Sequence, residues 1–326
     1  MTIVRWGVLS TAGIGMRKVT PAIQRAGNCE VVAIASRDAS AAESAAAELG
    51  IASFYGSYEA LLAADDVDAV YIPLPNDMHA EWTIKAAASG KHVLCEKPLA
   101  MSAAQAAEMV DACETAGVKL MEAFMYRHHP SWVEAVRLVA DGAVGRPQAV
   151  QTWFSYHNDD AANIRNRLEH GGGALMDIGC YCINLSRLLF GAEPDVVESI
   201  VRRDPVMGVD VVTSVILAFP DGGQSAFTCS IRAEDYQRVY IFGTQGRIEI
   251  EIPFNIPPDR PTRVFVSAGG DPPVAPSTET VTFPPADAYA IEAEKFAQAI
   301  LDGAEVPVSP MDAVANMRVI DRILEG

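Results

Sequence analysis

The sequence is poor in the features that mark several protein classes. Its 326 residues include six cysteines and 7% aromatic residues, and 25 lysines and arginines face 42 acidic residues. The cysteines form no CxxC pair and lack the dense spacing of a disulfide scaffold, which indicates a reducing compartment, and we expect the cytoplasm. A formal net charge of −17 disfavours a nucleic-acid or membrane-surface binder, because both need clustered cations.

Long apolar runs are also missing. No stretch approaches the roughly 18 residues that a membrane span needs, and the first ten residues show no basic leader or cleavage site, so we expect no export signal. What remains is ordinary globular composition, with 50% hydrophobic and 21% charged residues. At about 150 residues per domain, the length predicts two domains.

Short β-branched runs alternate with alanine-rich helical runs over residues 1–123. This alternation predicts an α/β fold in which a doubly wound parallel sheet carries helices on both faces. Capping-box spacing of Ser40 with Glu43 and of Ser102 with Gln105 predicts two helix starts. The expected strands are Ile3–Leu9, Val31–Ser36, Ala69–Ile72, His92–Cys95 and Leu120–Ala123.

Residues 124–326 show longer strands joined by hairpin turns, which predicts a second, α+β domain with a largely antiparallel sheet. One helix is expected at about residues 174–189 and two more at 288–302 and 310–324, the last a candidate to pack back on the first domain. The proline-rich stretch 253–285 is expected to form loops and edge strands. The expected strands are Gln148–Tyr156, Val196–Arg203, Val211–Phe219, Gln224–Ile231, Gln237–Phe242 and Arg247–Ile252.

The first expected strand ends in a turn of small residues directly before a helix. Such a turn lets the backbone approach a pyrophosphate. Only the last glycine of the GxGxxG pattern is kept, so the turn alone also fits an ordinary tight turn, but its position in the alternating pattern favours a cofactor. The cofactor-binding residues expected here are Ser10, Thr11, Ala12, Gly13 and Ile14.

The second expected strand ends in Ser36-Arg37, where an NAD enzyme usually carries an acidic residue for the ribose hydroxyls. An arginine beside a hydroxyl suits a 2′-phosphate better, because a guanidinium binds phosphate through two parallel hydrogen bonds. We therefore expect NADP. The neighbouring Asp38 leaves NAD possible, and the alternative is a solvated arginine at a helix start.

Two more loops follow expected strands: residues 73–79 after Ala69–Ile72, and residues 96–98 after His92–Cys95. Both leave the carboxyl ends of their strands, the edge where open α/β sheets bind ligands. Lys97 in the second loop can stabilise a developing alkoxide or lower the pKa of a nearby hydroxyl. The alternative is a solvated lysine. The residues of these loops that we expect at the cofactor are Pro73, Leu74, Asn76, His79, Glu96 and Lys97.

A glycine run at residues 171–173 precedes a helix in which Asp177 and Tyr181 are spaced i, i+4 and share a face. A tyrosine near a lysine can act as a general acid or base, and the aspartate can orient substrate hydroxyls. The alternative is that both are satisfied in the core. The candidates for substrate contact are Phe154, His157 and Arg165.

Two clusters invite a metal interpretation, the pair His128-His129 and the motif Cys180-x-Cys182. Adjacent histidines seldom converge on one ion from regular structure, and residues two apart on a helix point their side chains to different sides. We therefore expect no metal site.

In order along the chain, the dinucleotide turn, Pro75-Asn76-x-x-His79, Glu96-Lys97-Pro98 and a GGGxxxDxGxY motif at residues 171–181 resemble the glucose-fructose oxidoreductase, inositol dehydrogenase and rhizopine-catabolism (Gfo/Idh/MocA) family. The resemblance covers essentially the whole chain. The segments AFMYRHHP, NIR and GGGALMDIGCYC look most like the branch of NADP-dependent D-xylose dehydrogenases and dimeric trans-dihydrodiol dehydrogenases. It implies a Rossmann domain and an open-faced sheet domain, often used as a dimer interface, so we expect a homodimer or dimer-based oligomer.

The resemblance further implies that Lys97 is the catalytic lysine and that Tyr181 and Asp177 match this branch. Many family members, including inositol dehydrogenases, carry histidine in place of Tyr181, which makes an inositol substrate less expected. The implied reaction is reversible hydride transfer between NADP and a sugar-like carbinol, such as C1 of xylose or glucose, with Tyr181 taking the hydroxyl proton. The alternatives are a trans-dihydrodiol, an anhydro-keto sugar, NAD-dependent glycoside cleavage and a non-catalytic dinucleotide sensor.

Overall fold

The computed structural model describes residues 3–268 and 277–325, and the chain divides into two compact units. The first unit comprises Met1–Met125 and Tyr289–Met317, and the second comprises Tyr126–Ala288 and Arg318–Gly326. The first segment of the first unit ends at Met125, two residues after the boundary expected at residue 123. Within the described residues, no helix is both long enough and apolar enough to cross a membrane.

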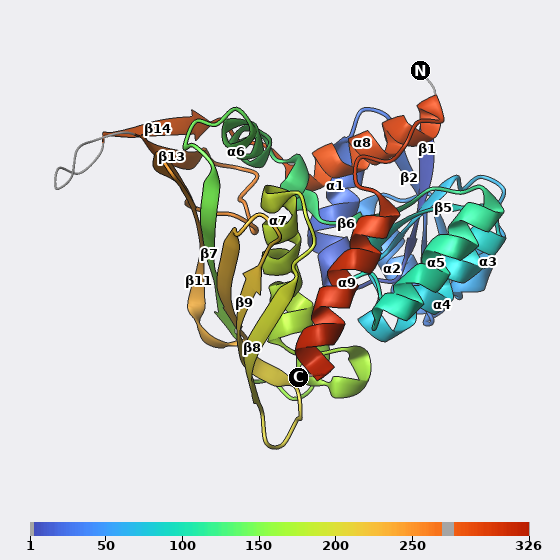
Figure 1. Cartoon of the computed structure of the whole chain (residues 1–326). Helices are drawn as coiled ribbons and strands as arrows, with labels where there is room; N and C mark the ends of the chain where they lie inside the picture. The colour runs from blue at the N-terminus through green and yellow to red at the C-terminus, as the bar shows by residue number, and fades with distance from the viewer. Residues whose placement is uncertain (1–2, 269–276, 326) are drawn as a thin grey trace. The chain divides into compact units, whose positions relative to one another are not determined.

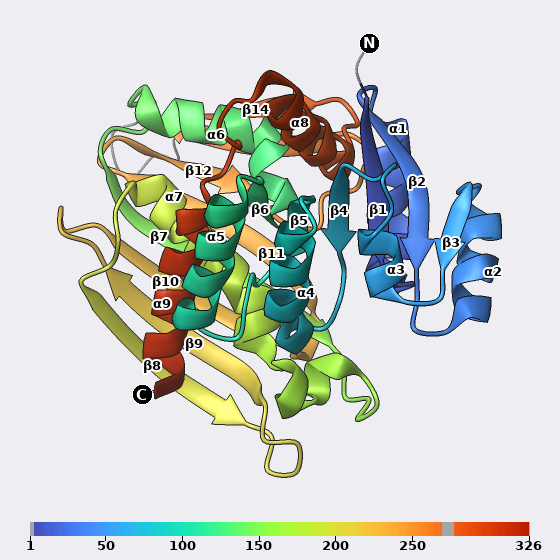
Figure 2. The ribbon, with the colours of Figure 1, turned by 90° about the vertical axis from the view of Figure 1, so that its right-hand side faces the viewer.

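The first unit is built on a six-stranded sheet with the strand order β3-β2-β1-β4-β5-β6. All of its strand pairs are parallel, which confirms the predicted doubly wound sheet. The chain builds outward in both directions from the β1/β4 pair, and this point in the sheet leaves a crevice at the carboxyl ends of the strands. The strands are β1 (Val4–Leu9), β2 (Cys29–Ala35), β3 (Ser53–Tyr55), β4 (Ala69–Ile72), β5 (His92–Glu96) and β6 (Leu120–Ala123) (Figure 2).

Helices cover this sheet and bury its apolar side chains. Every residue of β4 is buried, as expected for a strand covered on both faces. Helix α8, late in the chain, lies beside α1 and β1 (Figure 1), and its Phe296 ring packs 5.7 Å from the Trp6 ring of β1. The helices are α1 (Thr20–Arg25), α2 (Ala39–Leu49), α3 (Tyr58–Leu62), α4 (Asn76–Ala88), α5 (Ala103–Ala116) and α8 (Ala288–Asp302).

The two predicted helix caps have different outcomes. Ser102 caps α5 as expected, because its hydroxyl accepts a hydrogen bond from the Gln105 backbone N–H at 3.2 Å. The prediction at Ser40 is wrong, since Asp38 is the cap of α2 and its carboxylate accepts from the Ser40 backbone N–H at 2.9 Å. Aspartate two residues earlier satisfies the first free amides of the helix, so the helix begins sooner. Strand β3 was also not predicted.

The second unit is built on an eight-stranded sheet with the order β14-β13-β12-β11-β7-β10-β9-β8. Its pairs are antiparallel except for β10 with β7, which confirms a largely antiparallel sheet. The proline-rich stretch supplies β13 and the edge strand β14. The strands are β7 (Pro147–His157), β8 (Val196–Arg203), β9 (Asp210–Ala218), β10 (Gln224–Ser230), β11 (Arg232–Gly243), β12 (Gly246–Ile250), β13 (Thr262–Ala268) and β14 (Thr278–Phe283).

The helix expected at residues 174–189 consists of two parts. A π-helical turn, Leu175–Gly179, leads into α7 (Cys180–Phe190). Such wider turns occur often at functional sites. The remaining helices are α6 (Pro130–Ala140) and α9 (Pro310–Glu325), with 3-10 turns at Met125–His128, Ile164–Asn166 and Leu168–His170.

A buried carboxyl group stands out in the core of the first unit. Glu292 of α8 is 1% exposed, and its Oε1 atom has no hydrogen-bond partner among the residues that the structure describes. Burial raises the pKa of this carboxyl well above its ordinary value, and the charges of Glu96 and Glu122 raise it further. The Glu292 carboxyl therefore keeps its proton to a higher pH than an exposed glutamate does.

This raised pKa predicts how a Glu292→Gln variant behaves. The native state holds a proton that the unfolded chain releases above about pH 4.3, so wild-type stability falls as pH rises towards the pKa of buried Glu292. Glutamine has no proton to lose. We expect the variant to gain melting temperature over wild type, with a gain that grows from pH 5 to pH 8 in thermal denaturation. Glu294→Gln, on the exposed side of α8, is the control, and a gain independent of pH would contradict this account.

Candidate functional site

Ser10 connects two loops at the carboxyl edge of the first sheet. Its backbone φ is 135°, a region that favours glycine and costs other residues roughly 1–3 kcal/mol. The hydroxyl accepts a hydrogen bond from the Ala12 backbone N–H at 3.1 Å and donates to the Pro73 carbonyl at 3.4 Å. These bonds hold the turn after β1 against the loop after β4, and Ser10 occupies the place of the first glycine in the GxGxxG pattern.

The rest of the predicted cofactor turn, Thr11 to Ile14, is half-buried. A Cβ atom on Gly13 would lie 2.7 Å from Nη2 of Arg17, so the Arg17 guanidinium lies against the turn. We did not predict Arg17, although a cation four residues after Gly13 was visible in the sequence. A guanidinium at this place is suited to a phosphate group.

The two charged residues that follow β2, Arg37 and Asp38, have different surroundings. The Asp38 carboxylate caps α2, and hydrogen bonds from Ser40 and the backbone lower its pKa. The Arg37 side chain is exposed and interacts with the Tyr58 hydroxyl. Asp38 is therefore committed to the helix start, while Arg37 and the half-buried Ser36 offer a cation and a hydroxyl to a phosphate.

His79 lies inside the first unit rather than on its surface. Its side chain is 0% exposed, with Nε2 at 2.8 Å from the Leu74 carbonyl and Nδ1 at 3.0 Å from the Pro98 carbonyl. Burial lowers the pKa of this imidazole, while the neighbouring backbone carbonyls raise it. A neutral ring donates to only one of the two carbonyls, because it has a single N–H. The structure thus makes His79 a link between the loops after β4 and β5, and its contact with a cofactor stays a prediction.

The other predicted residues of these two loops lie at the carboxyl edge. Pro73 and Leu74 are buried, and Asn76 begins α4. Glu96 and Lys97 are half-buried, and the peptide bond between Lys97 and Pro98 is cis. The lysine is therefore on a loop beside the crevice between β1 and β4, where this class of sheet binds ligands.

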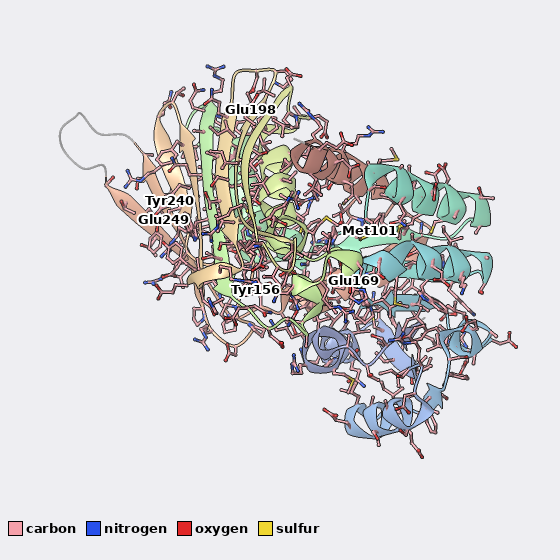
Figure 3. The ribbon with its side chains drawn as sticks, turned by 90° about the horizontal axis from the view of Figure 1, so that it is seen from below. Met101, Tyr156, Glu169, Glu198, Tyr240 and Glu249 are labelled. Carbon is pink, nitrogen blue, oxygen red and sulfur yellow. The ribbon has the colours of Figure 1, made fainter. Side chains whose placement is uncertain are left out.

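In the second unit, the structure brings Asp177 and Arg165 together. The Asp177 side chain is 14% exposed, and its Oδ2 accepts a hydrogen bond from Nε of Arg165 at 3.0 Å. The same oxygen accepts from the Tyr156 hydroxyl at 2.5 Å. Burial and the Asp177 charge raise the pKa of Tyr156, so this phenol remains protonated and acts as a donor. Tyr156, at the end of β7 (Figure 3), was not predicted from the sequence.

Tyr181 lies in a cluster of aromatic rings. It is 6% exposed, and its ring centre is 5.9 Å from Tyr126, 5.8 Å from Phe154 and 5.2 Å from Phe254. Phe154 is 3% exposed and stacks on Phe254 at 4.9 Å, which gives it a packing role. His157 is exposed and points to the face of β7 opposite Tyr156, because side chains alternate along a strand.

The glycine run before Asp177 is required by close packing. A Cβ on Gly172 would lie 2.7 Å from the Arg165 carbonyl oxygen, and one on Gly173 would lie 2.0 Å from Oδ1 of Asp210. The Asp210 carboxylate accepts from the Leu175 backbone N–H at 2.8 Å and so fixes the start of the π-helical turn. Asp210, which sequence reasoning missed, thereby positions the segment that carries Asp177 and Tyr181.

A cavity of about 510 Å³ adjoins Tyr156 in the second unit. It lies where β12 has ended and the chain turns away through Ile252. Carboxylate, amide and hydroxyl groups recognise a polyhydroxylated ligand through hydrogen bonds. The polar residues of the lining include Ser155, Tyr156, Asp235, Gln237, Glu251 and Asn255.

Comparison with known proteins matches both units. Residues 4–124 match the oxidoreductase family with an NAD-binding Rossmann fold, and residues 132–249 match the GFO/IDH/MocA C-terminal domain. The chain is 43% identical over 322 residues to a D-xylose 1-dehydrogenase (NADP(+)) of Haloferax volcanii, covering 98% of this chain and 96% of that protein. It is 35% identical over 253 residues to the mouse trans-1,2-dihydrobenzene-1,2-diol dehydrogenase, covering 76% and 74%.

Among solved structures, a 3-ketoreductase from Actinomadura kijaniata in complex with NADP and TDP-benzene is similar, with a TM-score of 0.91. The two are 31% identical, and the match covers 100% of this chain and 98% of that one. The fit of the turn after β1 to a dinucleotide therefore agrees with the proteins that the chain resembles.

Arg17, beside the turn after β1, and Arg37, after β2, predict separable effects on cofactor binding. Arg37→Ala removes the cation expected at the 2′-phosphate, so we expect NADPH affinity to fall about tenfold and NADH affinity to change little. Arg17→Ala removes the cation beside Gly13, expected at the pyrophosphate, so both affinities should fall by a similar factor. Fluorescence titration measures both. Lys18→Ala is the control, and an Arg17 effect confined to NADPH would place that residue at the 2′-phosphate instead.

Proposed function

Because this chain belongs to the Gfo/Idh/MocA family of NAD(P)-dependent, sugar-related oxidoreductases, we propose that it is an NADP-dependent aldose dehydrogenase. The substrate class is an aldopyranose such as xylose or glucose, oxidised at C1 to the lactone. The observation that carries this proposal is the 43% identity over 98% of the chain to an NADP-dependent D-xylose 1-dehydrogenase.

The surroundings of Asp177 support a polyhydroxylated substrate. Asp177 is held by the Tyr156 hydroxyl and the Arg165 guanidinium, which fix its carboxylate in one orientation. A carboxylate fixed in this way is preorganised to accept a hydrogen bond from a sugar hydroxyl. The cavity beside Tyr156 is lined in part by further carboxylate, amide and hydroxyl groups.

The residues of this chain divide the chemistry between them. The nicotinamide supplies the hydride acceptor when NADP is bound. We assign Tyr181 as the base that takes the proton from the C1 hydroxyl, and Lys97 as the cation that stabilises the developing charge on oxygen. Asp177 accepts a hydrogen bond from a neighbouring hydroxyl and orients the ring. The reverse reaction returns the proton from Tyr181 to the carbonyl oxygen.

A second candidate is oxidation of a cyclic trans-dihydrodiol. The 35% identity to a mouse trans-1,2-dihydrobenzene-1,2-diol dehydrogenase supports it. The rings around Tyr181, those of Tyr126, Phe154 and Phe254, are buried and pack on one another, so they do not decide between the two substrates. Reduction of a keto sugar is the same chemistry run in the opposite direction.

Nicotinamide absorbance tests the proposal directly. Purified protein is incubated with NADP or NAD and with xylose, glucose, other aldoses or a trans-dihydrodiol, and growth at 340 nm is followed. We expect fast NADPH formation with an aldose. Lys97→Ala and Tyr181→Phe should each lower kcat by about 100-fold or more while NADPH binding stays near wild type.

Other outcomes identify the rivals. Turnover with the dihydrodiol alone supports the second candidate, and release of a leaving group without net NADPH supports glycoside cleavage. Binding of NADPH without turnover of any substrate supports a sensor. Near wild-type turnover in Lys97→Ala or Tyr181→Phe would show that the assigned roles are wrong.

We propose that the outer face of the second sheet pairs two copies of the chain. It exposes Trp153 (43%), Ile200 (79%) and Ile216 (53%) around a groove of about 560 Å³. Glu198 and Arg238 border the same groove, and Arg238 pairs with Glu249 of its own chain at 3.3 Å, so the apolar residues carry the proposed pairing. Figure 3 labels Glu198 and Tyr240 on this sheet.

An Ile200→Glu variant tests this pairing, because it places a charge in the apolar part of the face. We expect wild type to sediment as a dimer and the variant to sediment as a folded monomer in analytical ultracentrifugation. Val206→Glu, 90% exposed in the turn after β8, is the matched control and should remain dimeric. A monomeric wild type, or a dimeric Ile200→Glu variant, would contradict the proposal.

A further inference from the structure

The turn that carries Lys97 is held by polar side chains on both sides of the lysine. Before it, the Tyr71 hydroxyl of β4 donates to Oε1 of Glu96 at 2.5 Å. After it, the Pro98 carbonyl lies 3.0 Å from Nδ1 of His79, and the Leu99 backbone N–H donates to Oε1 of Glu122 at 2.7 Å. Three different elements of the first unit therefore contact the residues flanking Lys97.

All three of these holding side chains are deeply buried. Tyr71 and His79 are 0% exposed, and Glu122 is 3% exposed. A buried carboxylate or imidazole costs free energy unless its hydrogen bonds are made, and a loop at the edge of a sheet can ordinarily satisfy its backbone with water. Buried polar side chains of this kind hold a turn in one conformation, as the supporting residues of functional sites do.

His79 extends the same network to the neighbouring loop. Its Nε2 lies 2.8 Å from the Leu74 carbonyl, in the loop that follows β4. Pro98 has no backbone N–H, so the first backbone donor after Lys97 is that of Leu99, which Glu122 accepts. The position of the Lys97 main chain is thus set from β4, α4 and β6 together.

We propose that Tyr71, His79 and Glu122 are positioning residues that hold Lys97 in place for hydride transfer, with Glu122 the decisive member. The proposal rests on the proposed catalytic role of Lys97. Loss of the Glu122 acceptor leaves the Leu99 N–H unpaired in the protein interior. Because an unpaired buried donor costs free energy, the turn moves to find another acceptor for it. A displacement of the lysine by about 1 Å is enough to cost roughly 100-fold in rate.

Two variants distinguish the effect of the hydrogen-bond acceptor of Glu122 from the effect of its charge. Glu122→Gln keeps a carbonyl oxygen for the Leu99 N–H, whereas Glu122→Leu removes it. Tyr71→Phe removes a single hydroxyl from Glu96 and keeps the buried ring, so it tests the same network with the least risk to folding. Glu292→Gln is the matched control, because Glu292 lies near Glu96 and Glu122 in the same core and, among the residues that the structure describes, its Oε1 bonds to no part of the turn.

The experiment measures kcat, KM, the pH profile of kcat and the NADPH dissociation constant, with thermal unfolding as a check of folding. We expect Glu122→Leu to lower kcat by about 10- to 100-fold and to move the limb of the pH profile that Lys97→Ala abolishes. The NADPH dissociation constant should stay within about twofold. Glu122→Gln should recover most of kcat, and Tyr71→Phe should lower kcat several-fold.

Each other outcome has a definite meaning. If Lys97→Ala abolishes turnover while Glu122→Leu and Tyr71→Phe keep wild-type kcat and pH profile, the positioning proposal is overturned and the role of Lys97 stands. An equal fall in kcat and NADPH affinity in Glu122→Leu, or a Glu122→Gln variant as slow as Glu122→Leu, also overturns it. If Lys97→Ala itself turns over normally, the proposed function fails, and the positioning proposal fails with it.

Discussion

The convergence of parallel strands at one edge of a sheet is the constraint on which this protein's first unit depends. Each crossover returns the chain to the same end, so the segments after β1, β2, β4 and β5 all emerge side by side. These segments contain backbone groups that need partners away from water. Ser10 and His79 supply them, and each joins two loops that are distant in sequence.

A related constraint shapes the second unit, where a charged group must be kept in one orientation. Asp177 lies in a π-helical turn whose start is fixed by the Asp210 carboxylate. Tyr156 and Arg165 then bind the same Asp177 oxygen from two other segments. Because both glycines before the turn pack against neighbouring atoms at distances that no side chain tolerates, this arrangement depends on the glycine run as much as on the polar groups.

The sequence predicted the elements of the fold because burial follows local pattern. Continuous apolar runs such as Ala69–Ile72 identify strands covered on both faces, and their bounds agree with the structure. The strand Ser53–Tyr55 escaped notice because it has three residues and none of them is buried. The start of α2 was misplaced because Ser40 and Asp38 are both good caps, and their competition is decided by backbone geometry.

Candidate site residues that belong to a short sequence motif could be predicted. Residues that only the folded chain brings to the site could not. Lys97, Asp177 and Tyr181 belong to short motifs, so the sequence alone names them. Tyr156 is 21 residues from Asp177, and Asp210 is 35 residues from Leu175, and no spacing rule connects such pairs. His79 was named for the right motif, while its burial between two carbonyl groups emerges only from the packing of α4.

The capping of α2 by Asp38 has an evolutionary consequence. In many dinucleotide-binding proteins the acidic residue after the second strand selects the cofactor, so a change of preference there disturbs two functions if that residue also begins a helix. In this chain Asp38 begins the helix, and we predict that the exposed Arg37 beside it selects the cofactor, so the two tasks belong to adjacent residues. On this prediction, a substitution at position 37 changes the cofactor preference while the helix that follows keeps its start.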